Sequence, residues 1–147
     1  MKKHILYIVV LTLFFTSCVK EEYFTPNANF EVYTVTSNNG TEVFDPIAKT
    51  VNSDGSESIE VKRNQQLEFR NTGSGSHFSI WVGVGSKDYF SSATNAQGDD
   101  FPLNSPFRYR YTSVGEYRLV VWANSVNAND PGEYSRGSKI CTVKVVD

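Results

Sequence analysis

The chain has 147 residues, with 14 basic and 16 acidic side chains, a formal net charge of −2 and two cysteines. This length is enough for one domain of ordinary size. The near-balanced charge and the scattered basic residues give no electrostatic footprint for nucleic acid, so we expect no nucleic-acid partner.

The first residues predict an export signal. Met1 to His4 form a short basic start, and an apolar run broken only by Thr12 extends from Ile5 to Phe15. About eleven helical residues at ~1.5 Å each would span only about half of a ~30 Å hydrocarbon core, which is short for a transmembrane helix. A charged start, an apolar middle and small residues at the end are typical of a secretory signal peptide.

The run ends in Phe15-Thr16-Ser17-Cys18, which resembles the lipobox of bacterial lipoproteins. The resemblance implies that Cys18 carries a diacylglycerol thioether, that the chain is cut before it, and that residues 1–17 are the signal peptide. Acyl chains contribute about 0.8 kcal/mol per buried methylene, so two or three of them would hold the protein stably on a membrane. The alternative is an ordinary secreted protein with an incidental cysteine.

Residues 18–27 are predicted to be a linker between the lipid and the domain. The segment Val19-Lys20-Glu21-Glu22 is similar to the lysine-plus-acidic signal of surface-exposed lipoproteins in Bacteroidetes-type bacteria, which implies a cell-surface location on the outer membrane. A solvated charged tether is the alternative interpretation. Cleavage would remove residues 1–17, leaving 130 of the 147 residues, and loss of Lys2 and Lys3 would shift the formal charge from −2 to −4.

Residues 28–147 are predicted to form one all-β domain. Apolar and polar side chains alternate with a period of two, and no stretch of a dozen residues keeps the three-four apolar spacing of a helix. The alternating sets contain Phe30 and Val32, Ile59 and Val61, Leu67 and Phe69, Phe78 to Val82, Tyr117 to Ala123, and Cys141 to Val145. Gly, Asn, Ser and Asp clusters separate these sets, as expected of turns. About seven short strands in roughly 120 residues favour an antiparallel β-sandwich.

Cys141 lies in the last of these predicted strands. Because Cys18 is assigned to the lipid, we expect no disulfide. Cys141 is then expected to be a buried thiol that packs as a small hydrophobic side chain.

Three segments carry a more specific likeness. Residues 109–121 contain an aromatic pair, a Gly turn and then Tyr with an alternating strand; residues 64–72 form a strand ending in Asn-Thr; and residues 80–85 read Ile-Trp-Val-Gly-Val-Gly. Together they resemble the polycystic-kidney-disease (PKD) domain, an Ig-like β-sandwich, with extra residues at 38–57 and 86–106. Two acidic positions of the family pattern are Trp81 and Val84 here. The resemblance implies the fold and leaves the ligand open, because such sandwiches serve many roles.

Trp81 and Trp122 are candidate ligand-binding residues. Their chain neighbours are expected to face the core, so both tryptophans are expected to point away from it. In the fold that the resemblance implies, the strands at 78–82 and 117–123 are neighbours, which would bring both rings to the outer face of one sheet. A large exposed aromatic surface usually has a partner, such as sugar rings or another protein.

The extra residues at 86–106 offer a different outcome. They would fold back over the two tryptophans, with Tyr89, Phe90 and Phe101 as the covering side chains.

Two polar loops are expected at the same end of the sandwich. They are residues 71–77 and residues 124–135, and the second contains Tyr134, a third candidate ligand-binding residue. Loops at one end of a sandwich can form a binding surface, and small polar residues with one Tyr suit adaptable polar contacts. Plain solvated turns are the alternative.

No catalytic residue, metal ligand or cofactor is expected. His77 is the one histidine after the signal, and no acidic residue or nucleophile motif accompanies it in sequence. No paired His or Cys spacing for a metal is present. Oxygen ligands for calcium exist at Asp99, Asp100, Asn127, Asn129 and Asp130. Their order differs from that of an EF-hand loop, so we interpret these side chains as solvated.

These features predict a surface lipoprotein with a non-catalytic binding domain. The first hypothesis is a glycan-binding accessory of a nutrient-uptake system, a role that the resemblance to Bacteroidetes-type surface lipoproteins implies. The second is a structural or adhesive module that contacts another protein of the cell envelope. The expected partners are the membrane, through Cys18, and a polysaccharide or an envelope protein.

Overall fold

All regular structure that the computed structural model describes is β-strand, and the described residues are 25–83, 98–126 and 134–147. In chain order the strands are β1 (Phe30–Asn38), β2 (Thr41–Pro46), β3 (Thr50–Val51), β4 (Glu57–Lys62), β5 (Leu67–Asn71), β6 (His77–Trp81), β7 (Asp99–Asp100), β8 (Phe107–Tyr109), β9 (Gly115–Val126) and β10 (Tyr134–Val146). The sequence predicted about seven strands. β2, β3 and β7 lie in segments without apolar alternation, so their sequence carries no strand pattern.

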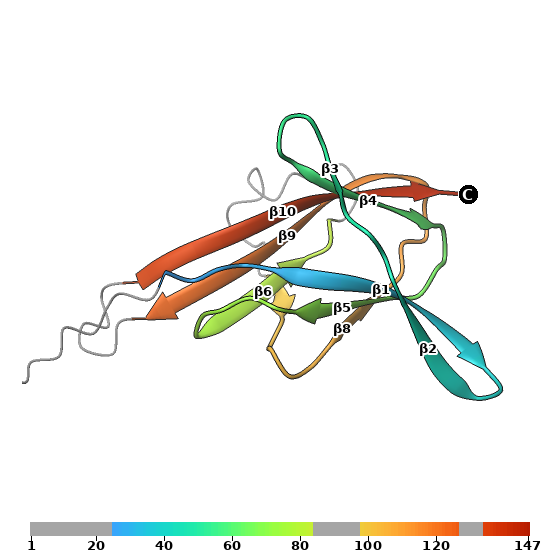
Figure 1. The fold of residues 1–147 in the computed structure, drawn as a ribbon, viewed down its shortest axis with the longest axis horizontal. Coiled ribbons are helices and arrows are strands. Elements are labelled where there is room, and N and C mark those ends of the chain that lie inside the picture. The colour runs from blue at the N-terminus through green and yellow to red at the C-terminus, as the bar shows by residue number, and fades with distance from the viewer. Residues whose placement is uncertain (1–24, 84–97, 127–133) are drawn as a thin grey trace, which may run out of the picture.

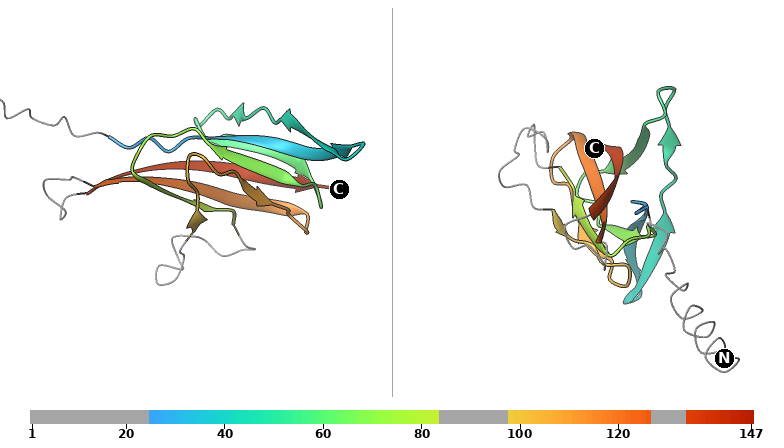
Figure 2. Two further views of the ribbon diagram at one scale, coloured as in Figure 1. Left: turned by 90° about the horizontal axis from the view of Figure 1, so that it is seen from below. Right: turned by 90° about the vertical axis from the view of Figure 1, so that its left-hand side faces the viewer.

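The strands form two sheets. The four-stranded sheet has the order β2-β1-β5-β8, and the six-stranded sheet has the order β3-β4-β10-β9-β6-β7. Figures 1 and 2 show these sheets as two layers, which confirms the predicted β-sandwich. The described strand pairs are antiparallel except β4 with β10, which run parallel from the pair Glu57–Cys141. A parallel pair needs a long connection, and the chain between β4 and β10 includes five further strands.

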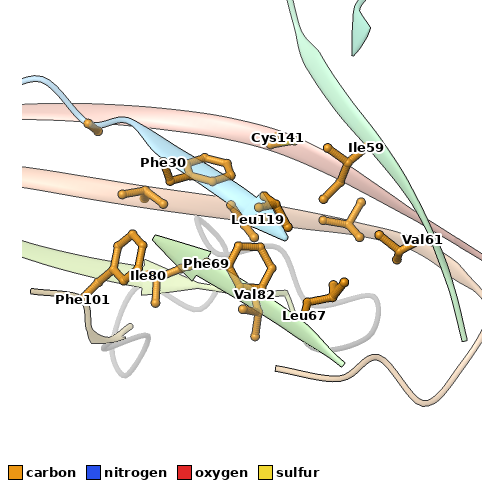
Figure 3. Packing of buried hydrophobic residues seen from close by; sticks show 14 of the residues in the cluster. Phe30, Ile59, Val61, Leu67, Phe69, Ile80, Val82, Phe101, Leu119 and Cys141 are labelled. Atoms are coloured by element: carbon orange, nitrogen blue, oxygen red, sulfur yellow. The ribbon is translucent and has the colours of Figure 1, made fainter. Parts of the chain in front are cut away.

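Apolar side chains from both sheets meet between the layers (Figure 3). Phe69 of β5 is fully buried, and its ring centroid lies 6.3 Å from those of Phe30 and of Phe107. The alternation predicted from the sequence is confirmed in the middle of β9 and the second half of β10, where every second residue belongs to this core: Leu119, Val121, Ala123, Cys141, Val143 and Val145. The described core cluster extends from Ala28 to Val145, so the chain from Thr25 onward contains all of it.

β1 and β2 form a hairpin that extends past its own sheet (Figure 1). β1 pairs with β5 only as far as Thr34, whereas its pairing with β2 continues to Asn38. Asn39 and Gly40 turn the chain with φ values of 51° and 80°. Positive φ at both central residues is the geometry of a type I′ turn, for which Asn-Gly is strongly preferred. The end of the hairpin is therefore a two-stranded ribbon.

The two ends of the sandwich differ. At one end Thr25 enters beside the loop that precedes β6, where Asn27 and Ser74 exchange two backbone hydrogen bonds of 2.8 Å. Gly137 of β10 lies so close there that an added Cβ would collide with the carbonyl oxygen of Pro26. The hairpin turn and the C-terminus lie at the opposite end (Figures 1 and 2).

Candidate functional site

Trp81 and Trp122 lie on the outer face of the six-stranded sheet. β6 and β9 are neighbours, as expected, with Trp81 opposite Val120 and Ser79 opposite Trp122. The two tryptophans are therefore diagonal neighbours on one face, a geometry in which large side chains are within reach of each other. Ile80 is fully buried on the other face, and both tryptophans are half-buried.

The surroundings of the tryptophans are part apolar and part polar. Val120 faces away from the core but is fully buried, and Ile140 of β10 is paired with it and is 37% exposed. The Arg136 guanidinium lies 5.1 Å from the Trp122 ring centroid, and its Nε donates to Asn124 Oδ1 at 3.1 Å. This cation–π contact orients the Trp122 ring and gives this edge of the face hydrogen-bonding groups.

Phe101 does not cover the tryptophans, so its part in the alternative in which residues 86–106 fold over them is wrong. It is fully buried in the core, where its N–H donates to Phe78 O at 3.1 Å and its carbonyl accepts from Asn71 Nδ2 at 2.7 Å. Phe101 directly follows β7, which pairs with β6 at the edge of the sheet, so a strand-like path carries its ring inward. Tyr89 and Phe90 lie outside the described residues.

The two polar loops meet at one end of the sandwich in their described parts. Ser76 N–H donates to Asn124 O at 2.8 Å, and the hydroxyls of Ser76 and Ser125 are 3.5 Å apart. This is the end at which Thr25 enters. Residues 127–133 lie outside the described part of the chain, and Tyr134 opens β10 opposite Val126.

Among the residues considered for catalysis or metal binding, the described ones form no cluster. His77 is exposed at the start of β6, opposite Asn124. Asp99 and Asp100 are exposed in β7, whereas Asn127, Asn129 and Asp130 are not described. Within the described residues no three His, Cys, Asp or Glu side chains gather as metal ligands would.

Cys141 is a free, fully buried thiol, as expected. Burial raises its pKa to about 11, so the thiolate is disfavoured at neutral pH. Cys18 lies outside the described residues.

A polar network on the outer face of the four-stranded sheet escaped the sequence analysis. Glu68 is only 2% exposed, and its carboxylate accepts hydrogen bonds from Arg70 Nε at 2.8 Å and Arg108 Nε at 2.9 Å. Arg108 also binds both carboxylate oxygens of Glu42 at 2.7 Å, and these hydrogen bonds lower the pKa of Glu42. The Arg70 guanidinium lies 4.9 Å from the Phe44 ring centroid. Alternating charges within a strand were the available signal, but they did not reveal which strands would be neighbours.

A groove of about 380 Å³ lies between β1 and the segment that follows β2. Lys49 contributes an ammonium group to its lining, which donates to Phe30 O at 2.6 Å and pairs with Glu57 at 3.4 Å. Both contacts lie within the protein and engage the Lys49 ammonium. The groove is therefore a weaker candidate ligand-binding site than the sheet face that carries Trp81 and Trp122.

No protein-family model and no curated protein sequence matches the chain. Among the described residues, no helix is long and apolar enough to cross a membrane.

Proposed function

We propose that this chain is a lipid-anchored cell-surface protein whose β-sandwich binds a glycan, as an accessory of a nutrient-uptake system. The observation that carries the binding proposal is the pair Trp81 and Trp122, placed diagonally on the sheet face opposite the core. Aromatic rings offer flat apolar surface for sugar rings, and the amide and guanidinium groups beside Trp122 suit hydroxyl groups. The proposed role is binding without catalysis.

The strand order supports the PKD-like, Ig-like part of the proposal. β1-β5-β8 against β6-β9-β10 matches the order A-B-E against C-F-G of Ig sandwiches. Gly83, which the PKD resemblance aligns with a family glycine, has φ of 71°, and an added Cβ would lie 3.0 Å from Arg118 O. That position requires glycine for both reasons.

Lipidation is tested in cells. Metabolic labelling with a palmitate analogue should mark the wild-type protein, and Cys18→Ala should remove both the label and the membrane association. Protease treatment of intact cells then distinguishes surface exposure from an inward-facing anchor. A Cys18→Ala protein that stays labelled and membrane-bound contradicts the anchor.

Glycan binding is tested on the chain from residue 19 onward, by iodide quenching of tryptophan fluorescence and titration with a panel of polysaccharides. Trp81→Phe and Trp122→Phe assign each signal to one ring. Trp81→Ala and Trp122→Ala should each weaken binding about tenfold or more, which is 1.4 kcal/mol or more. The matched control is Phe44→Ala, a half-buried aromatic on the other sheet. Unchanged fluorescence with every polysaccharide contradicts the proposal.

The second candidate function is a structural or adhesive module. The observation that favours it is the β1–β2 hairpin, which extends from the end of the sandwich far from Thr25 (Figure 1). If Cys18 is anchored, seven residues at most ~3.6 Å each keep Thr25 within about 25 Å of the lipid. The polar loops at the Thr25 end would then be the membrane-proximal part, and the hairpin would be able to reach outward. Pull-down with and without hairpin substitutions tests this candidate.

A further inference from the structure

The outer edge of β2 is an open strand edge. β2 is the last strand of the four-stranded sheet, so among the described residues no strand lies on its other side. Its residues are exposed except Phe44, which is half-buried, and Val43 is 38% exposed. An open edge of this kind presents backbone N–H and C=O groups that can pair with another strand.

Two backbone hydrogen bonds of β1 identify which groups face that edge. Val35 N–H points to β5, where it donates to Gln66 O at 2.9 Å, whereas Val32 O points to β2 and accepts from Ile47 N–H at 2.8 Å. Even-numbered residues of β1 therefore direct their backbone groups toward β2. Hydrogen-bonded and non-hydrogen-bonded pairs alternate along an antiparallel ladder. The β2 residues opposite these even-numbered residues therefore direct their backbone groups toward β1; they are Thr41, Val43 and Asp45.

The β2 residues between these three direct their backbone groups outward, away from β1 and toward the open edge. Glu42 and Phe44 each present one N–H and one C=O, and Pro46 presents a C=O alone because proline has no N–H. An antiparallel copy of the same strand, centred on Phe44, gives every outward N–H an acceptor. Phe44 exchanges two hydrogen bonds with Phe44 of the other copy, and each Glu42 N–H meets the Pro46 carbonyl opposite it.

We propose that this edge is a homodimer interface, in which two copies of the chain pair β2 with β2 about a two-fold axis at Phe44. The two four-stranded sheets then join into one continuous sheet. An isologous interface of this kind needs a self-complementary surface. The edge supplies it for every donor, because each outward N–H of one copy meets a carbonyl of the other, and only the Glu42 carbonyl, opposite a proline, is left to water.

Side chains agree with this register. Glu42 faces Pro46 of the second copy instead of another carboxylate, and its charge is already compensated by Arg108 at 2.7 Å. On the opposite face Val43 meets Asp45 of the second copy. A register centred on Glu42 would place two carboxylates side by side, which is destabilising.

The paired copies are antiparallel, so their Thr25 ends lie at opposite ends of the joined sheet. Tethers that leave in opposite directions suit a contact between two surfaces, or a dimer that lies flat on one surface. The inference rests on the second candidate function and names the partner as another copy of the chain. It does not depend on glycan binding.

The test begins with sedimentation of the chain from residue 19 onward over a concentration series, where we expect a monomer–dimer equilibrium. A monomer at every concentration overturns the inference. A monomeric protein would not contradict the second candidate function, the structural or adhesive module, because pull-down of a different envelope protein tests that function separately.

Cross-linking then tests the register in a Cys141→Ala background. Residues opposite each other in a hydrogen-bonded antiparallel pair have Cα atoms about 5.5 Å apart, within the range of a disulfide. Phe44→Cys should therefore form a disulfide dimer about tenfold faster than Val43→Cys, which has no cysteine opposite it. Equal rates, or a faster reaction at Val43→Cys, overturn the register.

A charge pair covers the case in which Phe44→Cys fails to fold. Val43→Lys should tighten the dimer several-fold, because it places an ammonium opposite Asp45 of the second copy, and Val43→Glu should weaken it to a similar extent. The two variants have side chains of similar length at one exposed position, so a folding defect would change both dimer affinities in the same direction. The proposed pairing expects changes in opposite directions. Equal dimer affinities for the two variants contradict the proposed pairing.

Discussion

Tyr111 and Tyr117 provide a matched test of how burial sets the value of a hydrogen bond. Both hydroxyls donate to a backbone carbonyl, Tyr111 to Val82 at 2.8 Å and Tyr117 to Ser113 at 2.9 Å. The rings are neighbours, with centroids 4.7 Å apart. They differ in burial, because Tyr111 is 2% exposed and donates to the buried Val82, whereas the Tyr117 hydrogen bond is exposed.

Replacing each tyrosine by phenylalanine removes only the hydroxyl. In Tyr111→Phe the Val82 carbonyl is left buried without its donor, which costs about 1–3 kcal/mol, so we expect a loss of about 2 kcal/mol in the free energy of unfolding. In Tyr117→Phe water can replace the donor at the Ser113 carbonyl, so we expect a loss below about 0.5 kcal/mol.

Urea unfolding of the chain from residue 19 onward measures both values. With a typical slope of about 2 kcal/mol per molar urea, Tyr111→Phe should lower the midpoint by about 1 M and Tyr117→Phe by no more than about 0.3 M. Equal shifts for the two variants, or no shift for Tyr111→Phe, would refute the reasoning that burial decides the difference.

Four further outcomes are expected. Burial raises the pKa of Cys141 from about 9 to about 11, so the folded protein binds more protons than the unfolded chain between these values. Stability should therefore fall from pH 9 to pH 11, and a Cys141→Ala variant measured by denaturation should lose that part of the decline. A thiol reagent at pH 8 should label Cys141 only as fast as the protein unfolds, and rapid labelling of folded protein would contradict its burial. Gly137→Ala should lower stability by about 1–3 kcal/mol and expose the segment at Pro26 to limited proteolysis, because the added methyl displaces that segment. Phe69→Ala should lower stability by about 3–5 kcal/mol in urea unfolding, since it empties the centre of the core.

Short-range patterns predicted the parts of the fold that depend on neighbours in the chain. A strand places successive side chains on opposite faces, so alternation alone assigned Phe30, Phe69 and Leu119 to the core and Trp81 and Trp122 to the outer face. The β1–β2 hairpin was also predictable, because Asn39-Gly40 is the strongest short signal for such a turn. It was missed because β2 is exposed and has no apolar alternation.

Tertiary structure alone decided the features that join distant segments. Phe101 follows a polar stretch, and only the pairing of β7 with β6 carries its ring into the core instead of over the tryptophans. Glu68 reads as a solvated charge in sequence, yet it is buried because Arg108, forty residues later, becomes its neighbour across β5 and β8. Alternation is a property of one strand and is therefore written in local sequence. Which strands become neighbours depends on how the whole set of apolar faces closes around one core, and no local pattern records that.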